Sequence, residues 1–263
     1  MKRHILKNKT ILPNIYLILI LLFIYLPIFF VVLYSFNESK TTASWTGFSL
    51  KWYQSLLNNR DMFDALKNSL ILGVLSCFCA AVIGTLAAIG TSRIHYKSKG
   101  MMEYVSLLPI MIPEIILGMV FMAFFSFLKL PFGMLTLIIA HTTFCLPYIY
   151  MLVKARLVGI DKSIEEAARD LGASPFRTFL DITFPLIMPA IASGSLLAFA
   201  MSFDDVVISI FVTGARTSTL PIRVYSQVKF GVTPEINALC TIMLAIIFTT
   251  LGLFSFVKKL RKH

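Results

Sequence analysis

The sequence has little charge, and it lacks the motifs that hold nucleotides or perform hydrolysis. Only 14% of its 263 residues are charged, whereas 57% are hydrophobic. In soluble domains about 25% of the residues are charged and about 45–50% are hydrophobic. This balance excludes a disordered chain and most soluble enzymes, and it indicates a protein that folds in lipid. G-x-x-x-x-G-K-[ST], H-E-x-x-H and G-x-S-x-G do not occur. We therefore expect no ATP site within the chain and no catalytic chemistry.

Metal and redox sites are not expected either. All four cysteines fall within apolar stretches, and the Cys77-x-Cys79 pair lacks zinc or redox spacing. We interpret them as small apolar fillers and predict no metal and no cofactor. His141 also lies in an apolar stretch, where polar groups usually face other helices. We interpret it as a hydrogen-bonded packing residue in preference to a ligand contact.

Long apolar stretches dominate what the sequence does contain. A helix needs about 20 apolar residues to cross a bilayer. Six stretches qualify, namely residues 14–36, 69–89, 104–127, 134–153, 186–211 and 236–257. The first is too long for the core of a cleaved secretory signal and should stay as an anchor. The sequence therefore predicts an all-α, polytopic membrane protein with six transmembrane helices.

Basic residues concentrate on one side of these spans. The net charge is +11, and most Lys and Arg residues lie in the two tails and in the loops after the second and fourth spans. Since basic loops stay in the cytoplasm, both termini are predicted to be cytoplasmic. The excess of positive charge then needs no nucleic-acid partner to explain it.

Close contact between helices is predicted at two ridges of small residues. One is Ala80-x3-Gly84-x3-Ala88 and the other is Ala190-x3-Gly194-x3-Ala198. Small residues at this spacing let helix backbones approach closely in a membrane.

The predicted cytoplasmic loop between the fourth and fifth spans carries helix boundary signals. Ser163 and Glu166 have the spacing of a capping box, which predicts a helix from Ile164. Gly172 is placed to end that helix in a left-handed conformation. Ser174 followed by proline predicts the start of a second short helix.

The first of these helices has a narrow apolar stripe. The stripe has the spacing i, i+3, i+4 and i+7 of a single helix face and consists of Ile164, Ala167, Ala168 and Leu171. The opposite face carries Glu165, Arg169 and Asp170. Such a helix can insert into a groove of a partner or pack on its own bundle, and periodicity alone favours neither.

The same loop resembles the EAA motif of ABC importer permeases. The segment Glu166-Ala167-Ala168, then Gly172, then Ile182-x-Phe184-Pro185 follows the pattern E-A-A-x3-G-x9-I-x-L-P, with Phe184 in place of leucine. The resemblance implies a type I importer permease fold and a loop that docks into a cytoplasmic ATPase. Its implied docking residues are Glu166, Ala167, Ala168, Leu171, Gly172 and Pro185.

Narrower matches extend over most of the chain. Pro113–Gly118, Ser202–Val207, Phe211–Gly214, Leu220–Tyr225 and Gly231–Ala238 resemble the C-type permease subunits of spermidine/putrescine importers. The resemblance implies import of a polyamine cation across a bacterial plasma (inner) membrane. It also implies three kinds of partner: a second, homologous permease, a pair of ATP-binding subunits and an extracytoplasmic substrate-binding protein.

The resemblance also suggests how the chain is divided. Residues 1–63 hold the N-terminal tail, the first span and an outer loop. Residues 64–257 form the permease domain, with the coupling loop at about 154–184. Residues 258–263 form a basic tail.

Acidic residues in the spans suggest a path for a cation. On a continuous fifth helix, one face would hold Ser195, Ser202, Asp205, Ser209 and Thr213. A carboxylate within the bilayer is costly unless it is compensated, and the predicted spans contain no deep Lys or Arg. We expect Asp205, with Asp204, Ser202, Ser209 and Glu114, to line a substrate path. Hydrogen bonding between helices is the alternative, particularly for Asp204.

Other functions also fit parts of the pattern. An ABC permease for another small cationic or organic solute would need the same loop. An ion-coupled secondary transporter would use the acidic residues for protons or sodium, but it should show an internal repeat, and we find none that is convincing. A scaffold or receptor has no need of paired aspartates beside a polar stripe.

Overall fold

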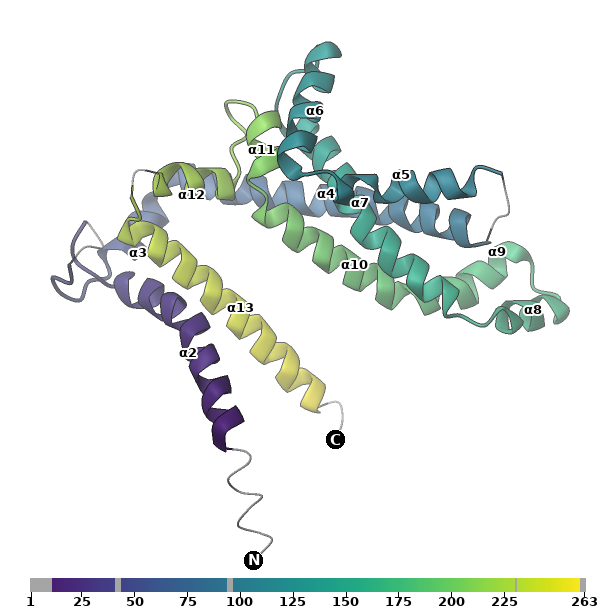
Figure 1. Ribbon diagram of the computed structural model, residues 1–263, viewed down its shortest axis with the longest axis horizontal. Coiled ribbons are helices and arrows are strands. Elements are labelled where there is room, and N and C mark those ends of the chain that lie inside the picture. The colour runs from purple at the N-terminus through teal and green to yellow at the C-terminus, as the bar shows by residue number, and fades with distance from the viewer. Residues whose placement is uncertain (1–10, 41–43, 94–96, 230, 261–263) are drawn as a thin grey trace, which may run out of the picture. The chain divides into compact units, whose positions relative to one another are not determined.

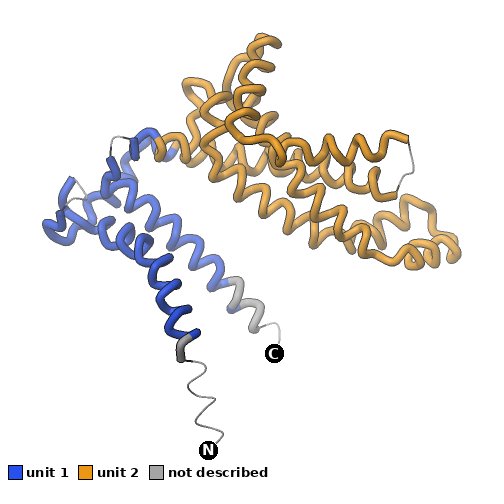
Figure 2. Tube along the Cα trace, viewed as in Figure 1, with its two compact units in different colours: residues 1–63, 226–263 blue, residues 64–225 orange. Residues whose placement is uncertain are grey.

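The computed structural model describes residues 11–40, 44–93, 97–229 and 231–260. These residues are almost entirely helical, apart from loops and one isolated bridge between Asn37 and Phe48 (Figure 1). The chain forms two compact units, residues 1–63 with 226–263 and residues 64–225 (Figure 2). The basic residues before residue 11 and those at 261–263, which support the predicted orientation, lie outside the described residues.

The first unit contains the first and last predicted spans. They form α2 (Ile11–Tyr34) and α13 (Pro234–Leu260). Helix α13 packs against α2 and against the short α3 (Lys51–Asn58). Asn59 and Ser55, at the end of α3 and within it, donate hydrogen bonds to Glu235 at 3.1 and 3.3 Å. These contacts hold the outer loop against the start of α13.

The second unit is built around α7 (Met134–Val158). Helix α7 packs against both α4 (Arg60–Arg93) and α10 (Phe184–Asp204). The residues of α4 from Asp64 onward belong to this unit. A Cβ added at Gly84 would lie 3.3 Å from the Leu146 carbonyl oxygen, and one at Gly194 would lie 3.1 Å from the Ile149 Cα. Both predicted small-residue ridges are therefore confirmed as close contacts, and both pack on α7.

The third predicted span is divided into two helices. It consists of α5 (Lys99–Met111) and α6 (Glu114–Phe127), bent by 108° at the break. Pro113 has no N–H group to continue the helix, and it forces Ile112 into an extended conformation. Among the residues that the structure describes, five helices are long and apolar enough to cross a membrane, or six if the bent pair counts as one span.

The fifth predicted span is also interrupted. Helix α10 ends at Asp204, and the short α11 (Val207–Val212) begins after an extended residue, Asp205 (φ −67°, ψ 125°). Helix α11 packs on α6, where Phe211 lies against Gly118. The chain continues into α12 (Leu220–Val228). The single helical face expected for Ser195 to Thr213 is therefore wrong, because the helix breaks in its middle.

Candidate functional site

The predicted coupling loop forms α8 (Lys162–Asp170), α9 (Pro175–Thr178) and a π-helical turn, η1 (Phe179–Thr183), that leads into α10. Helix α8 begins two residues before the predicted Ile164. Its N-cap is Asp161, whose carboxylate accepts a hydrogen bond from the Ser163 N–H at 2.9 Å. This bond lowers the pKa of Asp161. The predicted Ser163–Glu166 capping box is therefore wrong.

The predicted end of this helix is confirmed. Gly172 has φ +89°, in the left-handed region, and its N–H donates to the Arg169 carbonyl at 2.9 Å. The Ala173 N–H reaches back to the Ala168 carbonyl at 3.1 Å. Ser174 then caps α9 through the Arg177 N–H at 3.3 Å. The turn between α8 and α9 is thus fixed by local chemistry that the sequence shows.

Helix α8 has the reverse of the usual amphipathic arrangement. None of its residues is buried, and the apolar stripe faces outward, with Ile164 46% exposed and Leu171, just past the helix end, 90% exposed. Ala167 is exposed and Ala168 is half-buried. The two residues of α8 that turn toward the rest of the unit are Ala168 and Glu165, whose side chain is only 13% exposed. The alternative in which the apolar stripe packs on its own bundle is therefore not what the structure shows.

The remaining residues implied by the EAA resemblance are also accessible. Glu166 is exposed on α8, and Pro185 is exposed near the start of α10. Phe176 on α9 is 72% exposed and adds an aromatic ring to the same loop. None of the sequence motifs above includes Phe176, although an aromatic residue in a predicted cytoplasmic loop, one position after Pro175, is a usable signal.

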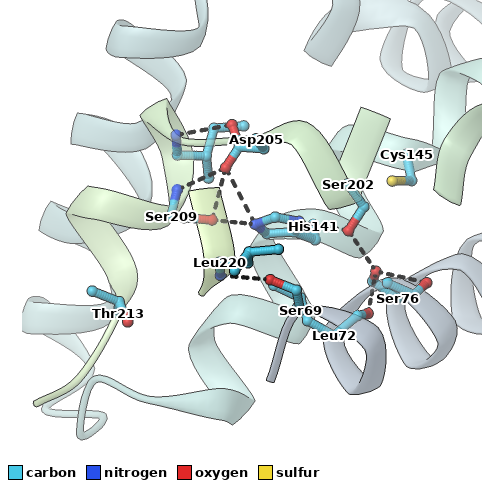
Figure 3. Close-up of polar contacts among 12 residues, drawn as sticks. Ser69, Leu72, Ser76, His141, Cys145, Ser202, Asp205, Ser209, Thr213 and Leu220 are labelled. Carbon is cyan, nitrogen blue, oxygen red and sulfur yellow. Dashed lines mark hydrogen bonds and ion pairs between the residues drawn. The ribbon is translucent and has the colours of Figure 1, made fainter. Parts of the chain in front are cut away.

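A second cluster forms where the chain breaks between α10 and α11 (Figure 3). The Asp205 carboxylate accepts hydrogen bonds from the Ile208 N–H at 3.2 Å, the Ser209 N–H at 2.8 Å and the Ser209 hydroxyl at 2.8 Å. Its side chain is 3% exposed. Asp205 thus caps the start of α11 from the break itself, which is why α11 can begin there.

His141 of α7 joins this cluster from the opposite side. Its Nε2 lies 3.0 Å from the Ser209 hydroxyl and 3.4 Å from the Asp205 carboxylate, and its Nδ1 lies 2.8 Å from the Ser202 hydroxyl. Because the Ser209 hydroxyl donates its only hydrogen bond to Asp205, its oxygen accepts a hydrogen bond from the Nε2–H of His141. His141 is fully buried, so the interpretation of it as a hydrogen-bonded packing residue is confirmed.

The network continues into α4. Ser202 lies 3.3 Å from the Ser76 hydroxyl, and Ser76 donates to the Leu72 carbonyl at 2.6 Å. Side chains of α4, α7, α10 and the break are thereby linked (Figure 3). The other two members of the expected stripe lie outside this network: Cys77 donates to the Ser195 backbone carbonyl at 2.9 Å, and Thr213 donates to the Thr217 carbonyl at 3.0 Å.

The two adjacent aspartates have opposite environments. Asp204, the last residue of α10, is exposed, whereas Asp205 is buried among hydrogen-bond donors. Glu114 is exposed at the first residue of α6, directly after the break at Pro113. Asp205, which was expected to line the path, is therefore buried, and Asp204, for which hydrogen bonding between helices was the alternative, is exposed. Within the described residues, no cluster of three or more His, Cys, Asp or Glu could hold a metal.

Curated relatives resemble most of the chain. The spermidine/putrescine transport system permease protein PotC of Escherichia coli K12 is 41% identical over 224 residues, which cover 85% of each chain. The putrescine transport system permease protein PotI of the same strain is 42% identical over 229 residues, or 84% of this chain and 82% of the relative. PotC of Haemophilus influenzae is 36% identical over 256 residues, or 97% and 100%.

Solved structures show the same fold. A bacterial ABC transporter involved in the import of the acidic polysaccharide alginate has a chain with a TM-score of 0.73 at 15% identity, covering 96% of both chains. A chain of the MetNI methionine ABC transporter has a TM-score of 0.59 at 18% identity, covering 80% of this chain and 96% of the other. The fold is thus that of ABC importer permeases.

The family match covers more than half of the chain and includes the predicted coupling loop and both helices beside the break. It spans residues 80–259. This result excludes the secondary transporter and the scaffold as alternatives. The chain is a membrane transport subunit and not an enzyme. The chain belongs to the family of binding-protein-dependent transport system inner membrane components.

Proposed function

We propose that this chain is the permease subunit of an ATP-driven importer that carries a polyamine cation, spermidine or putrescine, into the cytoplasm. The names of its relatives PotC and PotI support this substrate class. The proposed partners are a second, homologous permease, a dimer of cytoplasmic ATP-binding subunits and an extracytoplasmic substrate-binding protein.

The main observation that supports a coupling role is the outward-facing apolar stripe of α8. A helix on a soluble surface normally turns its apolar face inward. Here Ile164 and Leu171 are exposed, while the polar Glu165 faces the unit. Two small residues, Ala167 and Ala168, lie between them and permit close approach of another backbone. This arrangement fits a helix that lies in a groove of a partner, and we assign that groove to the ATPase.

Two single variants, each with a new carboxylate on a different face of α8, test the coupling role. Ala167→Glu puts a charge on the apolar stripe and should abolish co-purification of the ATPase while membrane insertion stays normal. Lys162→Glu puts the same side chain on the polar face, at the first residue of the helix, where the macrodipole favours a negative charge. This control should keep the ATPase bound. Equal co-purification of both variants would refute docking through the stripe.

For the substrate path we propose a division of roles around the α10–α11 break. A polyamine carries several positive charges separated by methylene groups, so it needs successive carboxylates to replace lost water. Asp204 and Glu114 are exposed and can meet such a cation, with aromatic faces for its chain. Asp205, Ser202 and Ser209 are buried in the network with His141 and hold the break that presents Asp204.

Uptake of radiolabelled spermidine and putrescine tests this path. The complete complex in proteoliposomes should accumulate at least one of the two labelled polyamines, and it should do so only when ATP is supplied. Asp204→Asn should reduce uptake at least tenfold while assembly and thermal stability stay unchanged. Normal uptake by Asp204→Asn would remove that residue from the path, and failure of both labels with the native complex would refute a polyamine substrate.

A further inference from the structure

A single carboxylate connects α8 to two other elements of its unit. The Glu165 Oε1 accepts a hydrogen bond from the Arg93 guanidinium at 2.8 Å and a second from the Thr183 hydroxyl at 2.9 Å. The side chains of Glu165 and Arg93 are 13% and 18% exposed, and Thr183 is buried. Ion pairs of this kind, charge-assisted and partly shielded from water, are stronger than surface pairs.

The three residues come from separate elements. Arg93 is the last residue of α4, and Thr183 is the last residue of η1, directly before α10. Glu165 lies in the first turn of α8. Since no residue of α8 is buried, apolar packing contributes little to its attachment. We call the three residues the Glu165 clamp.

The two elements joined by the clamp are separated by a groove. Towards the middle of α4 the helices touch, since a Cβ added at Gly73 would lie 2.8 Å from the Phe199 ring. Nearer the clamp, a groove of about 680 Å³ lies between α4 and the η1–α10 segment and is lined by Leu86, Ile89, Phe179 and Phe184, among others. The clamp therefore joins the two elements beyond the end of the groove, away from the contacts that α4 and α10 make at Gly73 and Cys77.

The turn at this bridge is π-helical. A π-helical turn is wider than an α-turn and occurs frequently at functional sites. Thr183 ends this turn, so a pull on its hydroxyl acts on the first residues of α10. Arg93 acts in the same way on the last residue of α4. Glu165 supplies the counter-charge of the Arg93 guanidinium through the ion pair at Nη2, whereas the buried Nε has no hydrogen-bond partner among the described residues.

We propose that Glu165 is a positioning residue that makes the ends of α4 and α10 move together with α8. The inference rests on the proposed docking of α8 to an ATPase. When the ATPase displaces α8, the clamp transmits that displacement to two helices at once. One of them, α10, ends at Asp204 and the break. ATP hydrolysis is thereby tied to movement at the proposed substrate path.

The test measures polyamine molecules transported per ATP hydrolysed by the reconstituted complex. Glu165→Gln keeps the shape but removes the charge, and it should lower this ratio at least fivefold while the ATPase remains bound. Thr183→Val removes one of the two bonds and should lower the ratio by a smaller factor. Asp181→Asn is the matched control, because it breaks the exposed Arg177–Asp181 pair in the same loop. It should leave the ratio unchanged.

A charge exchange separates the clamp from general damage. Arg93→Glu alone should lower the ratio, and Arg93→Glu combined with Glu165→Arg should restore part of it, since the Thr183 hydroxyl can also accept a hydrogen bond. An unchanged ratio in Glu165→Gln would overturn the proposal. Loss of ATPase binding in Glu165→Gln would also overturn it, by making Glu165 a docking residue. A separate result would refute the proposed docking of α8 through its apolar stripe, namely normal ATPase binding by Ala167→Glu.

Discussion

Replacing Asp205 by asparagine should destabilise the protein, whereas the same change at Asp204 should not. The Asp205 carboxylate accepts three hydrogen bonds, from the Ile208 N–H, the Ser209 N–H and the Ser209 hydroxyl. An asparagine oxygen can keep the two bonds from Ser209. Its amide group then faces the Ile208 N–H, so two donors oppose each other in a site that is 3% exposed.

Two routes give the size of the effect. Leaving one buried N–H without an acceptor costs about 1–3 kcal/mol. Impairing a side chain that caps the start of a helix costs about 0.5–2 kcal/mol, and Asp205 caps α11. Both routes point to about 2 kcal/mol, which is about a 30-fold change in the folded-to-unfolded ratio. Asp204 is exposed and should change stability by less than about 0.5 kcal/mol.

Thermal unfolding of the purified complexes in one detergent measures this difference. At about 2–4 °C per kcal/mol, Asp205→Asn should lower the melting temperature by about 4–8 °C. Asp204→Asn should melt with the native protein. If the two variants melt alike, or if Asp204→Asn is the less stable one, the buried network does not hold the α10–α11 break, and the proposed division of roles is wrong.

Three further predictions concern helix contacts and caps. Gly194→Val should cost about 1–3 kcal/mol in thermal unfolding, because its Cβ would lie 3.1 Å from the Ile149 Cα, and Gly252→Val, which has open space around it, is the control. Gly172→Val should reduce ATPase co-purification more than Gly172→Asn, because φ +89° strains a β-branched residue and asparagine tolerates it. The pKa of Asp161 lies below its ordinary 3.8 in the folded protein; its support of α8 is complete above that value and is lost as the pH falls through the lowered pKa. The protection factors of the α8 amides, which are exchange rates corrected for the intrinsic pH dependence of amide exchange, should therefore fall at acid pH in the native chain and stay constant in Asp161→Asn.

The features that the sequence predicted well depend on local chemistry. Gly172 and Ser174 set the turn between α8 and α9 through bonds to residues three to five positions away. The start of α8 was harder to predict, because Asp161 and Ser163 are both good caps. Asp161 is the one that caps, and its bond to the Ser163 N–H places Ser163 inside the helix.

The breaks in the third and fifth spans show two different limits. Hydropathy treats residues 104–127 as one apolar stretch, although Pro113 is visible in the sequence and accounts for the bend. The fifth span has no proline or glycine beside Asp205. Its break is stabilised by His141 and by Ser202, which is 61 residues away from His141 in the chain. A contact of that separation leaves no periodic signal, so a continuous helix was the natural expectation.

The positions of the two exposed carboxylates at helix ends suggest that they contribute unequally. Asp204 is the last residue of α10, where the helix macrodipole is negative and adds to its attraction for a cation. Glu114 is the first residue of α6, where the positive end of the dipole opposes its charge. Glu114→Gln is therefore expected to reduce polyamine uptake less than Asp204→Asn in the same proteoliposomes. A larger loss of uptake in Glu114→Gln than in Asp204→Asn would contradict this reasoning. It would mean that the helix macrodipoles do not influence how the carboxylates bind the cation, and that the α10–α11 break serves packing alone.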